Sequence, residues 1–274
     1  MSGALYIVST PIGNLEDITL RALRVLKEAD VIAAEDTRNS RKLLTHYGIS
    51  RPLISYWGER EKAGAEEAVR RLKQGLSVAL VSDAGTPGIS DPGSVLIRRA
   101  IEEGIRIVPV PGPSALLCAL SVSGLDCSEF VFCGFLPPKP AQRQKRLAEL
   151  VFDTRTLVFY EAPHRVSEML ADILEAFGDR PACVVREITK VHETVLRGGL
   201  ASIIRDLVAG KIAGEFVVVV SGRQESAAVS VGEALAEVRS LMKKGLSRKD
   251  AAKKVASAYG LSRSELYDRS LENG

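Results

Sequence analysis

The sequence contains few residues of the types that bind metals or form disulfides. It has three histidines and four cysteines in 274 residues, and no two cysteines form a C-x-x-C pair. Tetrahedral metal sites need closely spaced Cys and His ligands, so the spacing predicts no metal site. The cysteines lie in apolar segments, and we expect buried, reduced thiols.

Long apolar runs are also absent. No run approaches the ~20 residues of a membrane-spanning helix. A signal peptide would show a basic segment followed by an apolar one, and the N-terminus shows no such pattern. Hydrophobic residues make up 46% and charged residues 26% of the chain, as in ordinary globular proteins. We therefore expect a soluble cytoplasmic protein without a membrane partner, long enough for two domains.

Two familiar phosphate-binding loops are missing as well. The sequence has no G-x-x-x-x-G-K-[ST] motif, which excludes a P-loop. The turn after the first predicted strand reads S-T-P-I-G-N over residues 9–14, without the G-x-G-x-x-G pattern. This argues against an ordinary Rossmann dinucleotide site.

The most informative segment present is S-D-A-G-T-P-G-I-S-D-P-G over residues 82–93. It lies between a predicted strand and a predicted helix, where open α/β sheets bind ligands. Its two carboxylates, Asp83 and Asp91, suit ribose hydroxyls, an amine or a cation more than a phosphate. For Asp83 we favour contact with a cofactor, whereas Asp91 precedes Pro92 at a helix start, so Asx-turn capping of the loop is the interpretation we favour for it. The alternative for the whole loop is a purely structural connection.

The first half of the chain alternates between strand and helix patterns, which predicts a parallel α/β domain over residues 1–136. The stiff segment Pro137–Pro140 is expected to be a linker. A second α/β domain with a mixed sheet is expected over 137–222. The predicted strands are 5–8, 31–34, 78–81, 105–108, 156–160, 183–188, 194–197 and 215–220; the predicted helices are 19–27, 40–47, 65–74, 95–103, 115–122, 166–177 and 202–209.

The C-terminal segment carries the net charge. Residues 223–230 are small and polar and read as a second linker. Residues 232–274 hold nine basic and six acidic residues, a difference of +3 that equals the net charge of the whole chain. Ser247 with Asp250 and Ser262 with Glu265 resemble capping boxes. We expect a helix-turn-helix-like bundle over 231–274 that either binds RNA or serves as a solvated or dimerising element.

Polar residues follow two other strands. Glu35-Asp36-Thr37-Arg38 comes after the strand at 31–34, and more polar groups stand there than a turn needs. A substrate role is the favoured interpretation, with Arg38 and Arg41 holding phosphates. His164 and Arg165 follow the first strand of the second domain as further candidates. For His164, the alternative is a hydrogen-bonded structural residue.

Several long motifs in order carry a family resemblance. Residues 9–15, 35–38, 82–93, 109–115 and 159–165 together resemble the tetrapyrrole-methylase-like superfamily, and within it the ribosomal RNA small subunit methyltransferase I (RsmI) family. The resemblance implies two α/β domains with S-adenosylmethionine in the cleft between them, and a homodimer. It implies 2′-O-methylation of a cytidine ribose in the decoding region of small-subunit ribosomal RNA.

The positions of polar residues after the strands assign catalytic assistance to Glu35 or Asp36, and RNA contact to Arg38, Arg41, His164 and Arg165. The resemblance itself does not settle which residue is the base, but it implies the cofactor contacts. For Ser114, capping of a helix is an equal alternative to cofactor contact. The cofactor contacts implied are Pro11, Gly13, Asp83, Ala84, Gly85, Thr86, Pro87, Gly88, Ile89, Ser114, Ala115, Tyr160 and Val220.

One departure separates two branches of the superfamily. The porphyrin and corrin methylases carry a glycine-rich first turn of the type G-x-G-P-G, whereas this chain has a single glycine in Thr10–Gly13. The departure favours RNA over a tetrapyrrole. A small-molecule methylase of the same fold and a non-catalytic regulator remain as alternatives.

Overall fold

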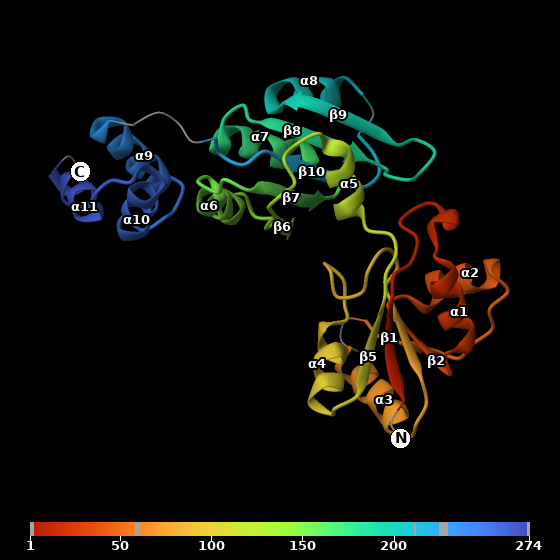
Figure 1. Cartoon of the computed structure of the whole chain (residues 1–274). Helices are drawn as coiled ribbons and strands as arrows, with labels where there is room; N and C mark the ends of the chain where they lie inside the picture. The colour runs from red at the N-terminus through yellow and green to blue at the C-terminus, as the bar shows by residue number, and fades with distance from the viewer. Residues whose placement is uncertain (1–2, 58–60, 211, 225–229, 273–274) are drawn as a thin grey trace. The chain divides into compact units, whose positions relative to one another are not determined.

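The computed structural model describes residues 3–57, 61–210, 212–224 and 230–272. The chain divides into two compact units (Figure 1). The first contains residues 1–118 together with 188–192, and the second contains the rest. Within the residues described, no helix is long and apolar enough to cross a bilayer.

The first unit is built on a parallel sheet with the strand order β3-β2-β4-β1-β5. Each strand is short and mostly apolar, and β2 and β4 are buried along their whole length. The elements are β1 (Ala4–Val8), η1 (Leu15–Asp17), α1 (Leu20–Glu28), β2 (Val31–Ala34), α2 (Thr37–His46), β3 (Leu53–Ser55), α3 (Glu61–Lys73), β4 (Val78–Val81), α4 (Ser94–Glu102), β5 (Arg106–Val110) and α5 (Ala115–Ser123).

The helices cover both faces of this sheet. One hydrophobic cluster includes Val25 and Leu26 of α1 and Leu44 of α2, and a separate cluster includes Leu72 of α3 and Leu96 of α4. The chain therefore leaves the neighbouring strands β1 and β4 toward opposite faces. This arrangement opens a crevice at the carboxyl edge of the sheet, where α/β folds bind ligands.

The second unit contains a mixed sheet with the strand order β6-β7-β10-β8-β9. Only β6 and β7 pair in parallel; β10 pairs antiparallel with β7 and β8, and β8 with β9. The predicted mixed sheet is confirmed. Its elements are β6 (Phe130–Phe135), α6 (Pro140–Leu150), β7 (Thr156–Glu161), α7 (Val166–Phe177), β8 (Pro181–Arg186), β9 (Thr194–Gly199), α8 (Leu200–Ala209) and β10 (Phe216–Val220).

The predicted domain boundary at 136/137 is wrong. The strand β6 pairs with β7 of the second sheet, and the chain divides after Cys118, inside α5. The segment Pro137–Pro140 is not an interdomain linker, because Pro140 is the first residue of α6. Proline is tolerated at that position since the first helical N–H has no partner within the helix. The strands β3 and β6 and the helix α6 had not been predicted.

A three-helix bundle completes the second unit: α9 (Val231–Lys243), α10 (Arg248–Tyr259) and α11 (Arg263–Glu272). The predicted caps are present, with Ser247 Oγ accepting from Asp250 N and Ser262 Oγ from Glu265 N. Of the predicted linker 223–230, residues 225–229 lie outside the described part. The bundle is not an isolated tail, because its apolar residues join the same hydrophobic cluster as those of β7, β10 and α7.

Arg223 is one of the residues that fasten the bundle to the rest of the second unit. The guanidinium carbon of Arg223 lies 4.7 Å from the ring centre of Phe152 and 4.4 Å from that of Tyr259. The same guanidinium donates to the Tyr259 hydroxyl and lies 3.8 Å from Glu237 of α9. Only 19% of the Arg223 side chain is exposed. Partial burial strengthens such cation–π contacts.

We expect Arg223→Ala to lower the free energy of unfolding by about 2 kcal/mol, because it removes two ring contacts and leaves Glu237 without its cation. Urea unfolding followed by far-UV circular dichroism measures the loss. The control is Arg239→Ala, an exposed arginine of α9, for which we expect a change within about 0.5 kcal/mol. Equal stability of the two variants would show that apolar packing alone holds the bundle.

Candidate functional site

Two loops meet in a short backbone pairing at the carboxyl edge of the first sheet. Thr10 N donates to Gly85 O (2.9 Å) and Gly85 N donates to Thr10 O (3.1 Å). The hydroxyls of Ser9 and Thr86 lie 2.8 Å apart. The loop after β5 joins them, because a Cβ placed on Gly112 would lie 2.9 Å from Ser9 Cβ. Three of the motifs singled out in the sequence therefore form one structure.

The glycines of the 82–93 loop are required by backbone conformation. Gly85 has φ +76° and Gly88 has φ +84°, both in the left-handed region. A Cβ on either would find its nearest neighbour at 3.6 Å, an ordinary contact. The glycines shape the loop so that Asp83 and Ala84 are exposed. Within the first unit, Gly85 and Gly88 are not required by a close approach between chain segments.

Position 13 needs a glycine because another segment packs against it, which the sequence did not indicate. Residues 188–192, between β8 and β9, belong to the first unit. A Cβ on Gly13 would lie 2.5 Å from Cγ of Lys190, and φ at Gly13 is +155°. The aliphatic part of Lys190 thus occupies the space that a side chain at position 13 would need.

Carboxylates gather where β2 and β4 end. Asp83 N donates to Glu35 Oε2 (3.2 Å), while the Asp83 carboxylate accepts from Asp36 N (3.1 Å) and Asn39 Nδ2 (2.9 Å). Burial raises the pKa of Glu35, and the charges of Asp83 and Asp36 add to the shift. Burial, with the nearby Glu35, also raises the pKa of Asp91 to about 6.

The pKa of Asp36 is shifted in the opposite direction to that of Glu35. Its carboxylate binds the Arg38 guanidinium through two hydrogen bonds (2.8 and 3.2 Å) and caps α2 by accepting from Arg38 N. These contacts lower the pKa of Asp36 to about 2. Asp36 therefore stays ionised and bound to Arg38, whereas the raised pKa makes Glu35 the more basic of these two carboxylates.

The carboxylate of Asp91 forms a hydrogen bond with Ser82 at the other end of the same loop and does not cap the following helix. Helix α4 begins at Ser94, its N-cap residue is Gly93, and no side chain caps it. Asp91 instead stands close enough to Glu35 and Asp83 for their charges to raise its pKa. It is thus a member of the acidic cluster, which periodicity around Pro92 could not show.

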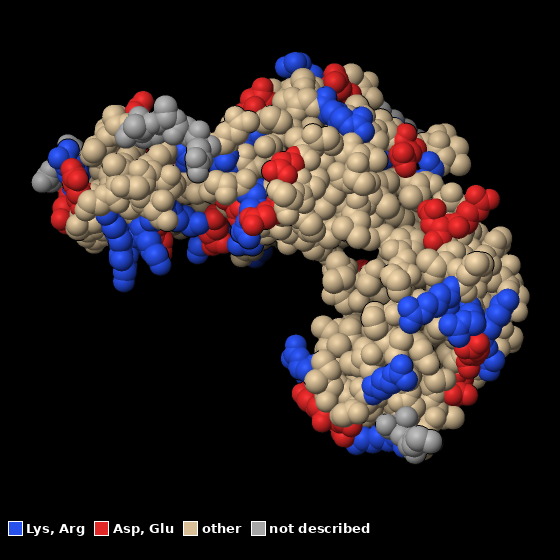
Figure 2. All heavy atoms as spheres, in the orientation of Figure 1, with Lys and Arg blue, Asp and Glu red and all other residues tan. Residues whose placement is uncertain are grey.

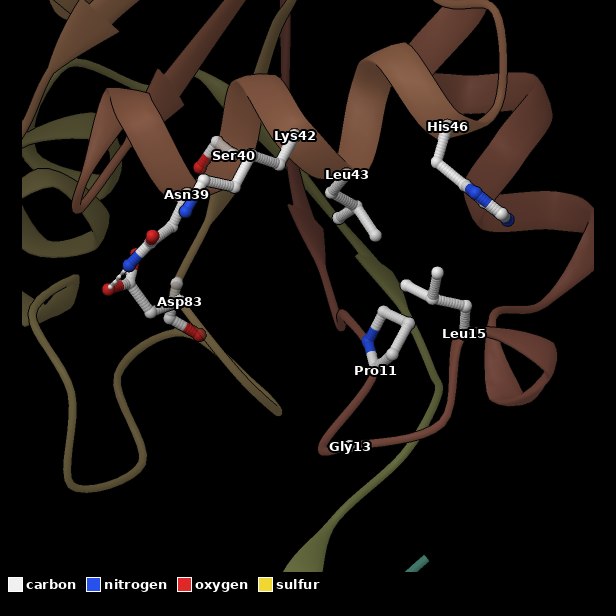
Figure 3. Close-up of a pocket in the computed structure, with 10 residues that line it drawn as sticks. Pro11, Gly13, Leu15, Asn39, Ser40, Lys42, Leu43, His46 and Asp83 are labelled. Atoms are coloured by element: carbon white, nitrogen blue, oxygen red, sulfur yellow. Dashed lines mark hydrogen bonds between the residues drawn. The ribbon is translucent and has the colours of Figure 1, made fainter. Parts of the chain in front are cut away.

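A pocket of about 410 Å³ lies beside these groups (Figure 3). Pro11, Leu15 and Leu43 form an apolar wall, Asp83 and Asn39 stand at one end, and His46 stands toward the other. This volume lies in the range of small-molecule sites. The remaining lining residues are Gly13, Ser40, Lys42 and Ser82.

One hydroxyl in this pocket lacks a partner. Ser40 is 4% exposed, and its Oγ forms no hydrogen bond within the described structure. An unsatisfied buried hydroxyl costs about 1–3 kcal/mol, which a polar ligand atom would relieve. Asn39, Ser40, Lys42 and His46 were not predicted; the signal for them was their i, i+3 and i+4 spacing after the Glu35–Arg38 motif.

The second unit holds the other predicted site residues. The Tyr160 ring makes edge contacts with Phe132 and Phe135, with ring centres 4.9 and 5.8 Å apart. The strand partner of Tyr160 on β10 is Val217, whereas Val220 pairs with Leu157 and is fully buried. The side chain of Val220 fills the core, so any contact of Val220 with a ligand would have to involve its backbone.

The predicted RNA contacts of the second unit differ from each other. Arg165 donates to Leu136 O (2.7 Å) and lies 3.2 Å from the buried Glu161 carboxylate. These contacts give Arg165 a structural role within its own unit, so they do not favour the predicted RNA contact. His164 is exposed.

In the first unit, Leu117 N lies 3.5 Å from Ser114 Oγ, a long capping bond that leaves the hydroxyl accessible to a ligand.

The described residues contain no cluster of three or more His, Cys, Asp or Glu side chains placed to hold a metal ion. The arrangement that does exist combines an apolar wall, an orphan hydroxyl and a carboxylate with a raised pKa. Such a site can bind a small molecule that combines an apolar part with polar groups, and Glu35, with its raised pKa, is hydrogen-bonded to Asp83 of the pocket lining.

We expect Asp91→Asn to stabilise the protein above pH 6. The folded-state pKa of Asp91 is about 6 against an ordinary 3.8, so ionisation costs the folded state stability as pH rises through that interval. The gain should be on the order of 1 kcal/mol at pH 8, allowing for solvent screening, and should vanish below pH 4. Urea unfolding at both pH values measures it. The exposed Asp17→Asn serves as control, and a gain that does not depend on pH would contradict the cluster.

The fold is that of known methylases. A solved cobalt precorrin-4 methyltransferase matches with a TM-score of 0.60 and 17% identity, covering 80% of this chain and 94% of its own. A uroporphyrin III C-methyltransferase from Thermus thermophilus matches with a TM-score of 0.57 and 19% identity, covering 80% and 97%. At these identities the likeness shows the fold alone.

Sequence comparison places the chain more closely. The model of tetrapyrrole (corrin/porphyrin) methylases matches residues 4–204, and that of the RsmI C-terminal HTH domain matches residues 228–274. Proteins named ribosomal RNA small subunit methyltransferase I are 48% identical in Xylella fastidiosa (97% of this chain, 98% of the relative) and 46% identical in Pseudomonas aeruginosa (99% and 98%). Since both domain models and the near full-length relatives agree, the chain belongs to the ribosomal RNA small subunit methyltransferase I family of the tetrapyrrole methylase fold.

Proposed function

We propose that the chain is an S-adenosylmethionine-dependent methyltransferase of small-subunit ribosomal RNA. The specific reaction proposed is 2′-O-methylation of a cytidine ribose in the decoding region, by a cytoplasmic homodimer, as the family resemblance implies. The observation that carries the proposal is the share of this chain that each group of similar proteins matches. Relatives named for ribosomal RNA methylation match 97% of the chain, including the helical bundle, whereas the solved tetrapyrrole methylases cover 80%.

The first unit has groups that fit the cofactor. S-adenosylmethionine combines an apolar base with ribose hydroxyls, an amine, a carboxylate and a sulfonium cation. The apolar wall of Pro11 and Leu15 suits the base, and the Asp83 carboxylate suits a hydroxyl or an amine. The orphan Ser40 hydroxyl offers one more polar contact. Further proposed cofactor contacts in the first unit are the exposed backbone around Gly85, and Ser114 with Ala115 at the start of α5. Tyr160 remains the predicted cofactor contact of the second unit.

The bound cofactor supplies an activated methyl group; the chain must orient the acceptor and take its proton. With the cofactor bound, the methyl group would pass from its sulfur to the ribose oxygen, and a residue of the chain would have to accept the hydroxyl proton. Glu35 is the proposed proton acceptor, because its pKa is raised and Asp36 is held ionised by Arg38. Asp36 instead fixes Arg38 and the start of α2.

We expect Glu35→Gln to lower the single-turnover methylation rate by ~10²–10⁴, the usual contribution of general-base catalysis. Asp36→Asn, the matched control, should affect the rate less, since its role is to position Arg38. Calorimetry should show unchanged S-adenosylmethionine affinity in both variants. A Glu35→Gln enzyme with a wild-type rate and pH profile would remove Glu35 from the chemistry.

An acceptor assay tests the function as a whole. Labelled S-adenosylmethionine is offered with small ribosomal subunits, with naked small-subunit RNA and with a porphyrinogen. We expect label in the RNA of one of the first two, resistant to alkaline cleavage at the modified nucleotide because the 2′-oxygen is blocked. Label only in the porphyrinogen would establish the small-molecule alternative, and label in none would favour a non-catalytic regulator.

The bundle is proposed to add RNA affinity. Helix α10 carries Arg248, Lys249, Lys253 and Lys254 against the single acid Asp250. Lys254 is already used inside the unit, where it donates to Glu149 O. Deletion at Gly222 would expose the shared apolar core. Charge substitution on α10 is therefore a cleaner probe of RNA binding than truncation.

A further inference from the structure

Helix α2 has an unusual charge pattern for a surface helix of this protein. It contains Arg38, Arg41 and Lys42 and no acidic residue. On three other helices of the described first unit, an arginine pairs with a glutamate of its own helix: Arg24 with Glu28 on α1, Arg71 with Glu67 on α3 and Arg99 with Glu102 on α4. The neutralising carboxylates found on these helices are missing from α2.

The cations of α2 are exposed and fall into two kinds. Arg38 has 86% of its side chain exposed, but Asp36 fixes its guanidinium through two hydrogen bonds. Arg41 and Lys42 are also exposed, and neither has an ion-pair partner in the part of the chain that the structure describes. Figure 2 shows Lys and Arg side chains gathered where α1 and α2 lie. Two unneutralised charges on one open helix favour an anionic partner.

A groove of about 540 Å³ follows this face of the helix. It is lined by Arg38, Arg41, Lys42, Thr45 and His46. Two of these residues, Lys42 and His46, also line the pocket that contains Asp83. The groove and the candidate site therefore share a wall, and a molecule in the groove lies next to the acidic cluster.

The shape of this surface favours a polymer over a free phosphate. From Arg38 to His46 the lining residues extend ~12 Å along the helix axis, at about 1.5 Å per residue. A single phosphate needs donors that converge on one point, whereas these side chains follow one another along an open groove. A sugar–phosphate backbone carries regularly spaced charges and ribose hydroxyls that such a groove can follow.

We propose that the α2 groove binds the phosphodiester backbone of the RNA next to the target nucleotide, with Arg41 and Lys42 as the main phosphate contacts. The inference rests on the proposed function and goes beyond it. It adds Lys42, Thr45 and His46 to the predicted Arg38 and Arg41, and it gives α2 two roles. The outer side holds the backbone, and the inner side, with Asn39 and Ser40, borders the pocket that receives the reacting group.

The test is the double variant Arg41→Gln/Lys42→Gln. Binding of small ribosomal subunits is measured against salt concentration, together with cofactor affinity by calorimetry. Each lost contact to single-stranded RNA should reduce the slope of log K against log[salt] by about 0.7, so the double variant should lose about 1.4. Affinity for subunits should fall at least tenfold, and this loss should exceed any change in S-adenosylmethionine affinity, which is measured because Lys42 also lines the candidate pocket.

The matched control is Lys62→Gln/Arg98→Gln, which removes the same charge from exposed positions on α3 and α4 of the same unit. If the control loses as much slope as the α2 variant, the effect is one of net charge and the groove proposal is overturned. An unchanged slope in the α2 variant would overturn it directly.

A second titration separates this proposal from the proposed function. Both variants and the unaltered protein are titrated with a single-stranded RNA oligonucleotide in the absence of cofactor. Suppose that the unaltered protein methylates no subunits, but only the α2 variant shows a reduced slope of log K against log[salt] for RNA binding. The proposed function is then wrong and the groove proposal is supported. If methylation occurs and the salt dependence of RNA binding is the same in the α2 variant and the control variant, the groove proposal is wrong and the proposed function is supported.

Discussion

The hydrogen bonds around Asp83 hold the candidate site together. Its backbone N–H binds Glu35, and its carboxylate binds the backbone of Asp36 and the side chain of Asn39. One residue at the end of β4 thereby fixes the end of β2 and the first turn of α2. The position of the groove, the pocket and the proton acceptor all depend on this link, because α2 carries or borders each of them.

The link brings like charges together, and the structure compensates unequally. Arg38 neutralises Asp36, so that carboxylate remains ionised. Glu35 and Asp91 have no comparable cation among the groups that set their pKa, and burial pushes both toward the neutral form. Two carboxyl groups with opposite tendencies therefore stand next to each other in the sequence, at Glu35 and Asp36. That difference separates a proton acceptor from a structural anchor.

Much of this architecture follows from local sequence. Apolar runs at 31–34 and 78–81 gave β2 and β4 with the right limits, and the Ser247 and Ser262 caps gave the starts of α10 and α11. Side-chain environment was harder. Asp91 looked like a cap because Pro92 follows it, but only the folded chain brings it near Glu35. Val220 is implied as a cofactor contact by the family resemblance alone, and the sequence did not show that β10 is the buried central strand of its sheet. The boundary at Pro137 failed because strand pairing between β6 and β7 is not a local property.

The contact between Gly13 and Lys190 has a consequence for the order in which the protein is made. The first turn lies near the N-terminus, yet the side chain that packs on it belongs to a segment synthesised much later. A nascent chain that has emerged only as far as α5 can form the five-stranded parallel sheet but lacks this covering segment. The edge of the sheet that carries the site is completed only when the β8–β9 connection leaves the ribosome. The protein thus cannot finish its first unit before the strands β6, β7 and β8 of the second unit have been translated.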